Sequence, residues 1–168
     1  MSDPFRENLL RLCDHTLVVI AERNKIPGAR APHPMFVGAA KAILGMTPED
    51  KLVSEFCERS WSRWEDVRLH RVDYFRDHAS DLFGGVPEGM VTQFKDFLLA
   101  RDAAGNLLTD LDPYWAYCEA LVKAAAHHIH RQRDWGPSKA DPTRMVYRKK
   151  YMAQVKLGEV AEAWGLTF

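Results

Sequence analysis

Apolar residues recur every three or four positions along most of this chain, which is the spacing of amphipathic helices. The pattern predicts five main helices, near residues 4–25, 48–60, 62–83, 88–100 and 113–132. Two shorter helices are expected at 35–44 and 157–164, the second closed by Gly165. Alternation of apolar and polar residues never extends beyond a few positions, so the predicted fold class is all-α.

Prolines and capping residues mark the expected helix ends. Residues 26–34 contain three prolines and predict an extended connector. In Thr47-Pro-Glu-Asp50 the Thr47 hydroxyl is the expected cap of the next helix, and Asp112 repeats this cap-plus-proline pattern. A continuous helix from 48 to 83 would be unusually long, so a kink is expected near Ser60–Ser62. Residues 143–151 fit either a basic helix or a short strand.

At 168 residues the chain can bury a core without disulfides or a structural metal. We expect one domain over residues 1–168, an irregular bundle of about six helices, with the connector at 26–34 and a basic C-terminal arm at 131–156. The three cysteines are far apart in sequence and odd in number, which favours a reducing, intracellular compartment. Apolar runs are too short to cross a bilayer and the N-terminus lacks a signal-peptide pattern, so a soluble protein of cytoplasm, nucleus or virion is expected, with no membrane partner.

The formal net charge is zero, but the charges are unevenly placed. Residues 1–122 carry 14 basic and 19 acidic side chains, whereas residues 123–156 carry nine basic and two acidic ones. Cations with interleaved aromatic residues can contact phosphates and stack on bases. The candidates for contact with a polyanion or another partner are Arg131, Arg133, Arg144, Arg148, Lys149, Lys150, Trp135 and Tyr147. The alternative is a solvated basic surface that meets the acidic part of a second copy.

Two groups of residues could bind a metal by type alone. His70, Asp73 and Asp77 would share one face of a continuous helix, and His127 and His130 are three positions apart. The Glu-x-x-His motif of di-metal bundles and the HExxH zinc motif are both absent, and arginines stand beside the acids. We therefore expect an ion-paired face and a charged helix end, with no metal or other cofactor.

The phosphate loop, the dinucleotide-binding motif and the nucleophile elbow of hydrolases are absent, so no catalytic residue is assigned. The leading interpretation is a non-enzymatic interaction, structural or regulatory protein that self-associates or binds another protein. A nucleic-acid-binding accessory protein using residues 123–156 is the alternative. A metalloenzyme built on histidines and carboxylates is a remote third.

Aromatic residues gather in two spans, which we expect to supply much of the core. Spaced aromatic residues also resemble those of small helical proteins of unknown function encoded by large DNA viruses. The segments that carry this resemblance are Phe56–Trp64, Asp73–His78, Tyr114–Tyr117, Leu121–Lys123 and Lys156–Trp164. The resemblance implies a virus-associated context and assigns no catalytic residue.

Overall fold

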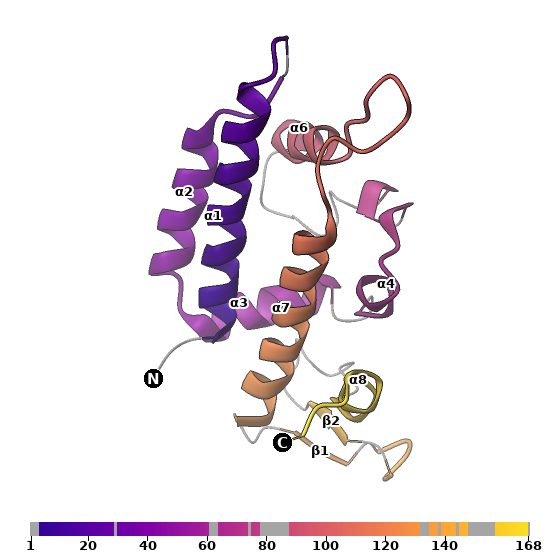
Figure 1. Ribbon diagram of the computed structural model, residues 1–168. Coiled ribbons are helices and arrows are strands. Elements are labelled where there is room, and N and C mark those ends of the chain that lie inside the picture. Colours follow the sequence, from indigo (N-terminus) through magenta and orange to yellow (C-terminus); the bar gives the residue numbers. More distant parts are fainter. Residues whose placement is uncertain are drawn as a thin grey trace.

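The computed structural model describes residues 4–28, 30–60, 64–73, 75–77, 88–131, 135–137, 139–143, 145–147 and 157–167. The described chain is mainly helical, as the sequence predicts (Figure 1). Its helices are α1 (Pro4–Asn24), α2 (Pro34–Met46), α3 (Glu49–Ser60), α4 (Trp64–Arg68), α6 (Glu88–Leu98), α7 (Asp112–Arg131) and α8 (Leu157–Trp164). Strands β1 (Trp135–Pro137) and β2 (Met145–Tyr147) form an antiparallel pair, with Trp135 opposite Tyr147. The ambiguous segment 143–151 therefore contains a strand at Met145–Tyr147.

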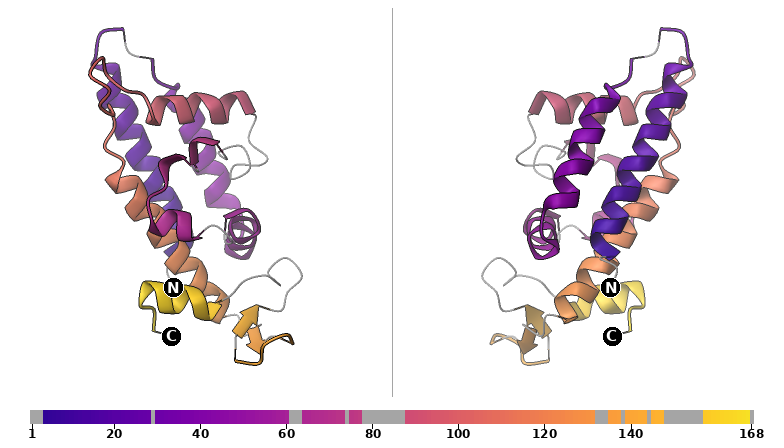
Figure 2. Two further views of the ribbon diagram at one scale, coloured as in Figure 1. Left: turned by 90° about the vertical axis from the view of Figure 1, so that its right-hand side faces the viewer. Right: turned by 90° about the vertical axis from the view of Figure 1, so that its left-hand side faces the viewer.

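Helix α1 organises the arrangement. It contacts α2 and α3, and it also contacts α7. The connector turns the chain back so that α2 runs along α1 and forms one edge of the molecule (Figures 1 and 2). At the opposite end of α7 from α6, α8 packs against α7 and β2.

Two buried apolar clusters lie along α1. The larger contains Phe5, which meets the ring of Phe56 edge-on at 5.2 Å between centroids. Its other buried members come from α3, α7 and α8: Leu52, Val53, Cys57, Leu121, Val122, Ala124, Ala125, Ala126, Ile129 and Val160. The smaller cluster joins Ile20, Val37 and Phe97 from α1, α2 and α6. One helix therefore holds residues of both clusters.

The prediction of a helix over 62–83 is wrong, because α4 ends at Arg68. His70 adopts a left-handed conformation with φ of 52°. The His70 amide donates to the Val67 carbonyl at 3.1 Å, and the Arg71 amide donates to the Asp66 carbonyl at 3.0 Å. These bonds form a Schellman motif, which terminates a helix and usually has glycine at the left-handed position. The expected kink near Ser60–Ser62 falls largely in residues 61–63, outside the described residues.

An aromatic stack offsets the cost of placing histidine, and not glycine, in this left-handed conformation. The His70 ring lies parallel to the buried Trp115 ring, 5.0 Å away, and Phe75 meets Trp115 edge-on, also at 5.0 Å. Trp115 of α7 is thus one of the aromatic core residues expected from the sequence. Trp61, Tyr74 and Phe83, expected beside it, lie outside the described residues.

The expected role of Thr47 is also wrong. Its hydroxyl donates to the Ile43 carbonyl at 2.7 Å, so it caps the end of α2 and not the start of α3. Arg6 of α1 completes this cap, with bonds to the carbonyls of Leu44 at 3.3 Å and Thr47 at 2.6 Å. The expected cap at Asp112 is wrong too, because Asp112 is the first residue of α7 and its amide donates to the Asp110 carboxylate at 3.0 Å. The expected end of α8 at Gly165 is confirmed, with φ of 63°.

Candidate interaction surface

Helix α2 is apolar around most of its circumference. Its 13 residues, Pro-Met-Phe-Val-Gly-Ala-Ala-Lys-Ala-Ile-Leu-Gly-Met, contain one charged side chain, Lys41. Only Val37 is buried, and Lys41 and Leu44 are half-buried. Because these three recur at intervals of four and three, they form the inner stripe, by which α2 contacts the rest of the chain. A helix that is apolar all round is normally covered on all sides.

The opposite face carries a second regular row of side chains. Met35, Ala39, Ala42 and Met46 follow one another at intervals of four, three and four, which places them on one face of the helix. All four are exposed, with exposed fractions of 66% for Met35 and 79% for Met46. We call these four residues the outer stripe. In Figure 1 helix α2 forms the left edge of the molecule, with α1 beside it on the right.

The flanks of α2 are apolar and open as well. Ile43 is 61% exposed, and Val18 of the adjacent α1 is 58% exposed. A methyl group added at Gly38 or Gly45 would meet no atom within 4 Å. Glycine in a helix interior costs about 0.5–1 kcal/mol relative to alanine, so packing within the described chain does not account for either glycine.

The exposed surface of α2 is nearly neutral. The Lys41 ammonium pairs with the Asp14 carboxylate of α1 at 2.5 Å, and Arg6 bonds the carbonyls at the end of α2. No other charged residue belongs to α2. The sequence contained the signal for this surface, because a helix of this length with one charge has no polar face to present to water.

The structure describes only part of the predicted polyanion surface. Arg131 is exposed at the end of α7. Trp135 and Tyr147 lie opposite each other in the strand pair. Lys139 is exposed between the strands, whereas Lys123 on α7 pairs with Glu119 at 2.8 Å. The remaining cations of 123–156 lie outside the described residues: Arg133, Arg144, Arg148, Lys149, Lys150 and Lys156. Whether the cations share one face therefore stays a prediction.

His127 and His128, neighbours near the end of α7, lie in different surroundings. His128 is buried, with its Nε2 2.6 Å from the Asp50 carboxylate and its Nδ1 3.8 Å from Glu49. Half-buried His127 has its pKa lowered by burial and then by the positive charges of Arg131 and His130. His128 thus joins α7 to the start of α3.

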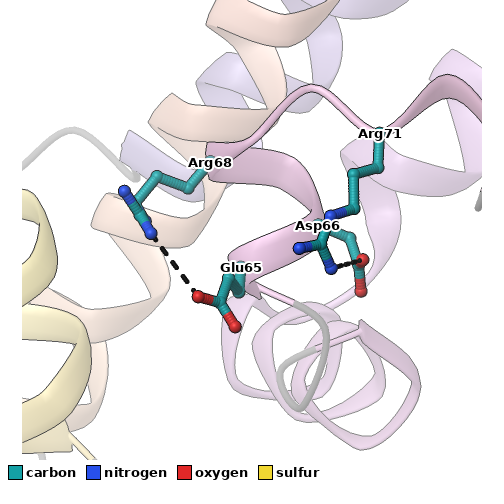
Figure 3. Close-up of polar contacts among 4 residues, drawn as sticks. All are labelled: Glu65, Asp66, Arg68 and Arg71. Atoms are coloured by element: carbon teal, nitrogen blue, oxygen red, sulfur yellow. Dashed lines mark hydrogen bonds and ion pairs between the residues drawn. The ribbon is translucent and has the colours of Figure 1, made fainter.

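The acidic face around α4 is ion-paired, as expected (Figure 3). The carboxylate of buried Asp66 accepts a bond from Arg71 at 3.0 Å, and Glu65 lies 3.5 Å from Arg68. Arg76 lies 3.2 Å from both Asp73 and Asp77. The helix break at residues 69–71 also separates His70 from Asp73 and Asp77, so the continuous face on which they were aligned does not form. In the described part of the chain, three or more histidine, cysteine or acidic side chains nowhere gather as a metal would require.

The cysteines are free thiols with raised pKa values. Burial raises the pKa of Cys118 to about 11 and raises that of Cys57 well above its ordinary value. Burial, followed by the nearby Asp14 carboxylate, also raises the pKa of Cys13. A thiol with a raised pKa is a poor nucleophile at neutral pH, because the thiolate is the reactive form. The three thiols are therefore unreactive groups that pack as small apolar side chains.

None of the helices in the described ranges combines the length and the apolar character needed to cross a bilayer. Comparison with known proteins adds no assignment: no protein-family model, curated protein or solved structure matches this chain.

Proposed function

We propose that this protein is a non-enzymatic interaction protein that self-associates through helix α2. The observation that carries the proposal is the outer stripe, which is exposed, apolar and uncharged. Water-exposed apolar patches on this scale are typical of interaction sites. The partner that fits the stripe best is a second copy of the same helix.

The order of residues in the outer stripe favours this partner. The stripe has the same order in both directions, with methionine at each end and alanine at the two central positions. In an antiparallel pair, Met35 would face Met46 of the second copy and Ala39 would face Ala42. Such a contact uses the same surface on both copies, as a twofold interface requires. The central alanines would allow the two helix backbones to approach closely.

Charge also favours a second copy over a charged partner. Lys41 is the only ionic group of α2, and Asp14 neutralises it within the same chain. Two copies of this surface would therefore meet without repulsion between like charges. A strongly acidic or basic partner would find no complementary charge on α2, because electrostatic complementarity needs opposed patches.

The available surface predicts a weak dimer. At ~1.5 Å per residue and ~10 Å diameter, half of the lateral surface of α2 amounts to about 300 Å². Exposed Ile43 on α2 adds to this area, but stable interfaces bury about 800 Å² per partner. We therefore expect a dissociation constant on the order of 10 µM.

Sedimentation velocity over a range of micromolar concentrations tests the proposal. The wild-type protein should shift from monomer to dimer as concentration rises. Ala39→Glu places a charge at the centre of the outer stripe and should leave a monomer with unchanged helix content. Leu69→Glu is the matched control, because Leu69 is also exposed, at 45%, but lies in the turn after α4. This control should dimerise like the wild type.

Salt distinguishes the apolar contact from one between oppositely charged parts of the chain. An apolar interface keeps its affinity at high salt, whereas attraction between the acidic and basic regions would weaken. A monomer at every concentration, or a dimer unaffected by Ala39→Glu, would contradict self-association through α2. A dimer lost at high salt would assign the contact to the charged regions instead.

A second candidate function is binding of single-stranded nucleic acid by the basic arm. It is supported by the strand pair, which brings two aromatic residues of that segment, Trp135 and Tyr147, to one register position. Fluorescence anisotropy with labelled oligonucleotides tests it. Replacing Lys149 and Lys150 by glutamate should weaken binding and reduce its salt dependence, because each phosphate contact releases counterions. Affinity no tighter than ~10⁻⁴ M at low salt would exclude this function.

The cellular setting is proposed on narrower grounds. The three free cysteines support a reducing compartment. The virus-associated context rests on the spaced aromatic residues alone and stays a prediction.

A further inference from the structure

A cleft opens where the end of α1 meets the connector and α6. Its volume is about 520 Å³, within the ~300–1,000 Å³ typical of small-molecule sites. Arg23 and Phe97 line it and are buried, whereas Ile26 and Leu108 line it and are about half exposed. None of its lining residues belongs to α2, so the cleft is independent of the surface proposed for self-association.

Arg23 is the unusual residue of this cleft. Arg23 as a whole is only 5% exposed, although its side chain is charged. Its Nη2 donates to the Thr109 hydroxyl at 2.7 Å, and its Nη1 lies 3.4 Å from the Phe97 carbonyl. The guanidinium carbon lies 4.7 Å from the centre of the Phe97 ring. Every one of these partners is neutral.

The guanidinium of Arg23 is therefore held by neutral groups and not by a direct ion pair. Among the described residues no carboxylate forms an ion pair with Arg23, although the neighbouring Lys25 pairs with Glu22 at 2.9 Å. A guanidinium remains protonated at all physiological pH values. Burying such a charge without a counterion is unfavourable, so an anion that reaches Arg23 gains more than it would from an exposed arginine.

The other lining residues define what kind of anion fits. Arg30 and Asp96 also line the cleft and are both exposed, so two positive charges face one negative charge. This balance favours a ligand with a single negative charge over a dianion such as phosphate. Exposed Pro27, with the half-exposed Ile26 and Leu108, provides apolar contacts for the rest of the ligand.

We propose that the cleft between α1, the connector and α6 binds a monocarboxylate with an apolar body, whose carboxylate pairs with Arg23. The two sources of such a group are a free organic acid and the C-terminal residue of a peptide. Both present one planar carboxylate beside an apolar chain. Planar carboxylates match the donor geometry of arginine.

An NMR titration of the full chain, monitored through its amide chemical shifts, tests the site with defined probes. Hexanoate represents the free acid, and N-acetyl-phenylalanine represents a peptide end. Both should shift the signals of Arg23, Phe97 and Ala100 and saturate. N-acetyl-phenylalanine amide, which lacks the charge, should bind at least about tenfold more weakly, because a charge-assisted pair is lost. Preference for one of the two acids identifies the source.

Exposed residues provide variants that do not disturb the core. Asp96→Asn removes the opposing charge and should tighten carboxylate binding about threefold, and Arg30→Gln should weaken it by a similar factor. Arg23→Gln should abolish binding, and circular dichroism checks that this variant is folded. Equal binding of inorganic phosphate, equal binding of the amide, the absence of saturation, or unchanged affinity in both surface variants would overturn the proposal.

Discussion

At the residue scale, several side chains act in ways that their sequence neighbours do not reveal. Thr47 precedes a proline and two acids, as an N-cap should, but its hydroxyl reaches back to the Ile43 carbonyl. Both bonds are local, so sequence spacing cannot decide between them. His70 ends a helix without a glycine signal because Trp115, 45 positions later, stacks on its ring. Such a long-range contact is invisible to local propensity.

His70 leads to a prediction that separates strain from stacking. A left-handed conformation costs a residue other than glycine about 1–2 kcal/mol, and an aromatic stack contributes about 0.5–1.5 kcal/mol. His70→Ala keeps the strained conformation and loses the stack, so it should lower the free energy of unfolding by about 1 kcal/mol. His70→Gly loses the stack but relieves the strain, so it should be close to neutral.

Urea denaturation of the two variants measures this difference. The glycine variant should be the more stable of the two. Equal stabilities would show that the left-handed turn after α4 does not contribute as described.

At the element scale, the sequence predicted most helix positions because apolar periodicity and proline or glycine breaks act locally. Helices α1, α2, α3, α6, α7 and α8 start and end within about two residues of the expected ranges. The region after α4 was missed, because periodicity continues through the left-handed turn. The exposure of α2 was not predicted either, since a helical pattern does not say which faces find partners.

Helix α2 itself provides the second prediction. Gly38 lies in the helix interior, and an added methyl group would meet nothing within 4 Å. Gly38→Ala should therefore raise the free energy of unfolding by about 0.5–1 kcal/mol through the lower entropy cost of alanine. Gly45→Ala should give a smaller gain, because Gly45 lies in the last turn of α2.

Thermal unfolding, measured at protein concentrations too low for dimerisation, checks both variants. A loss of stability in Gly38→Ala would indicate a close backbone contact at Gly38 that the open space around it does not show.

At the scale of the whole molecule, α1 links the two apolar clusters. Phe5 and Ile20 are both fully buried and lie 15 positions apart on the same helix. No periodicity in the sequence distinguishes one cluster from two, because the division depends on where α6 and α3 pack. The Arg23 cleft also escapes sequence analysis, since it is formed by segments from three parts of the chain.

This arrangement predicts cooperative unfolding. Phe5→Ala and Ile20→Ala should each lower the free energy of unfolding by about 2–5 kcal/mol, because each removes a buried side chain and leaves a cavity. Calorimetry should show a single transition in both variants, since α1 belongs to both clusters. Val18→Ala, on the exposed side of α1, is the control and should change stability by less than about 0.5 kcal/mol.

Two separate transitions, with only one of them shifted by Ile20→Ala, would contradict the coupling of the clusters through α1.

The connector between α1 and α2 has a consequence for proteolysis. Lys25 and Arg30 are both exposed there, and neither is followed by proline, so trypsin can cleave after each of them. Cleavage would leave the N-terminal helix as a separate peptide, joined to the rest by noncovalent contacts alone. Those contacts include both apolar clusters and the bonds of Arg6, so the severed helix should stay bound and the nicked molecule should keep its shape.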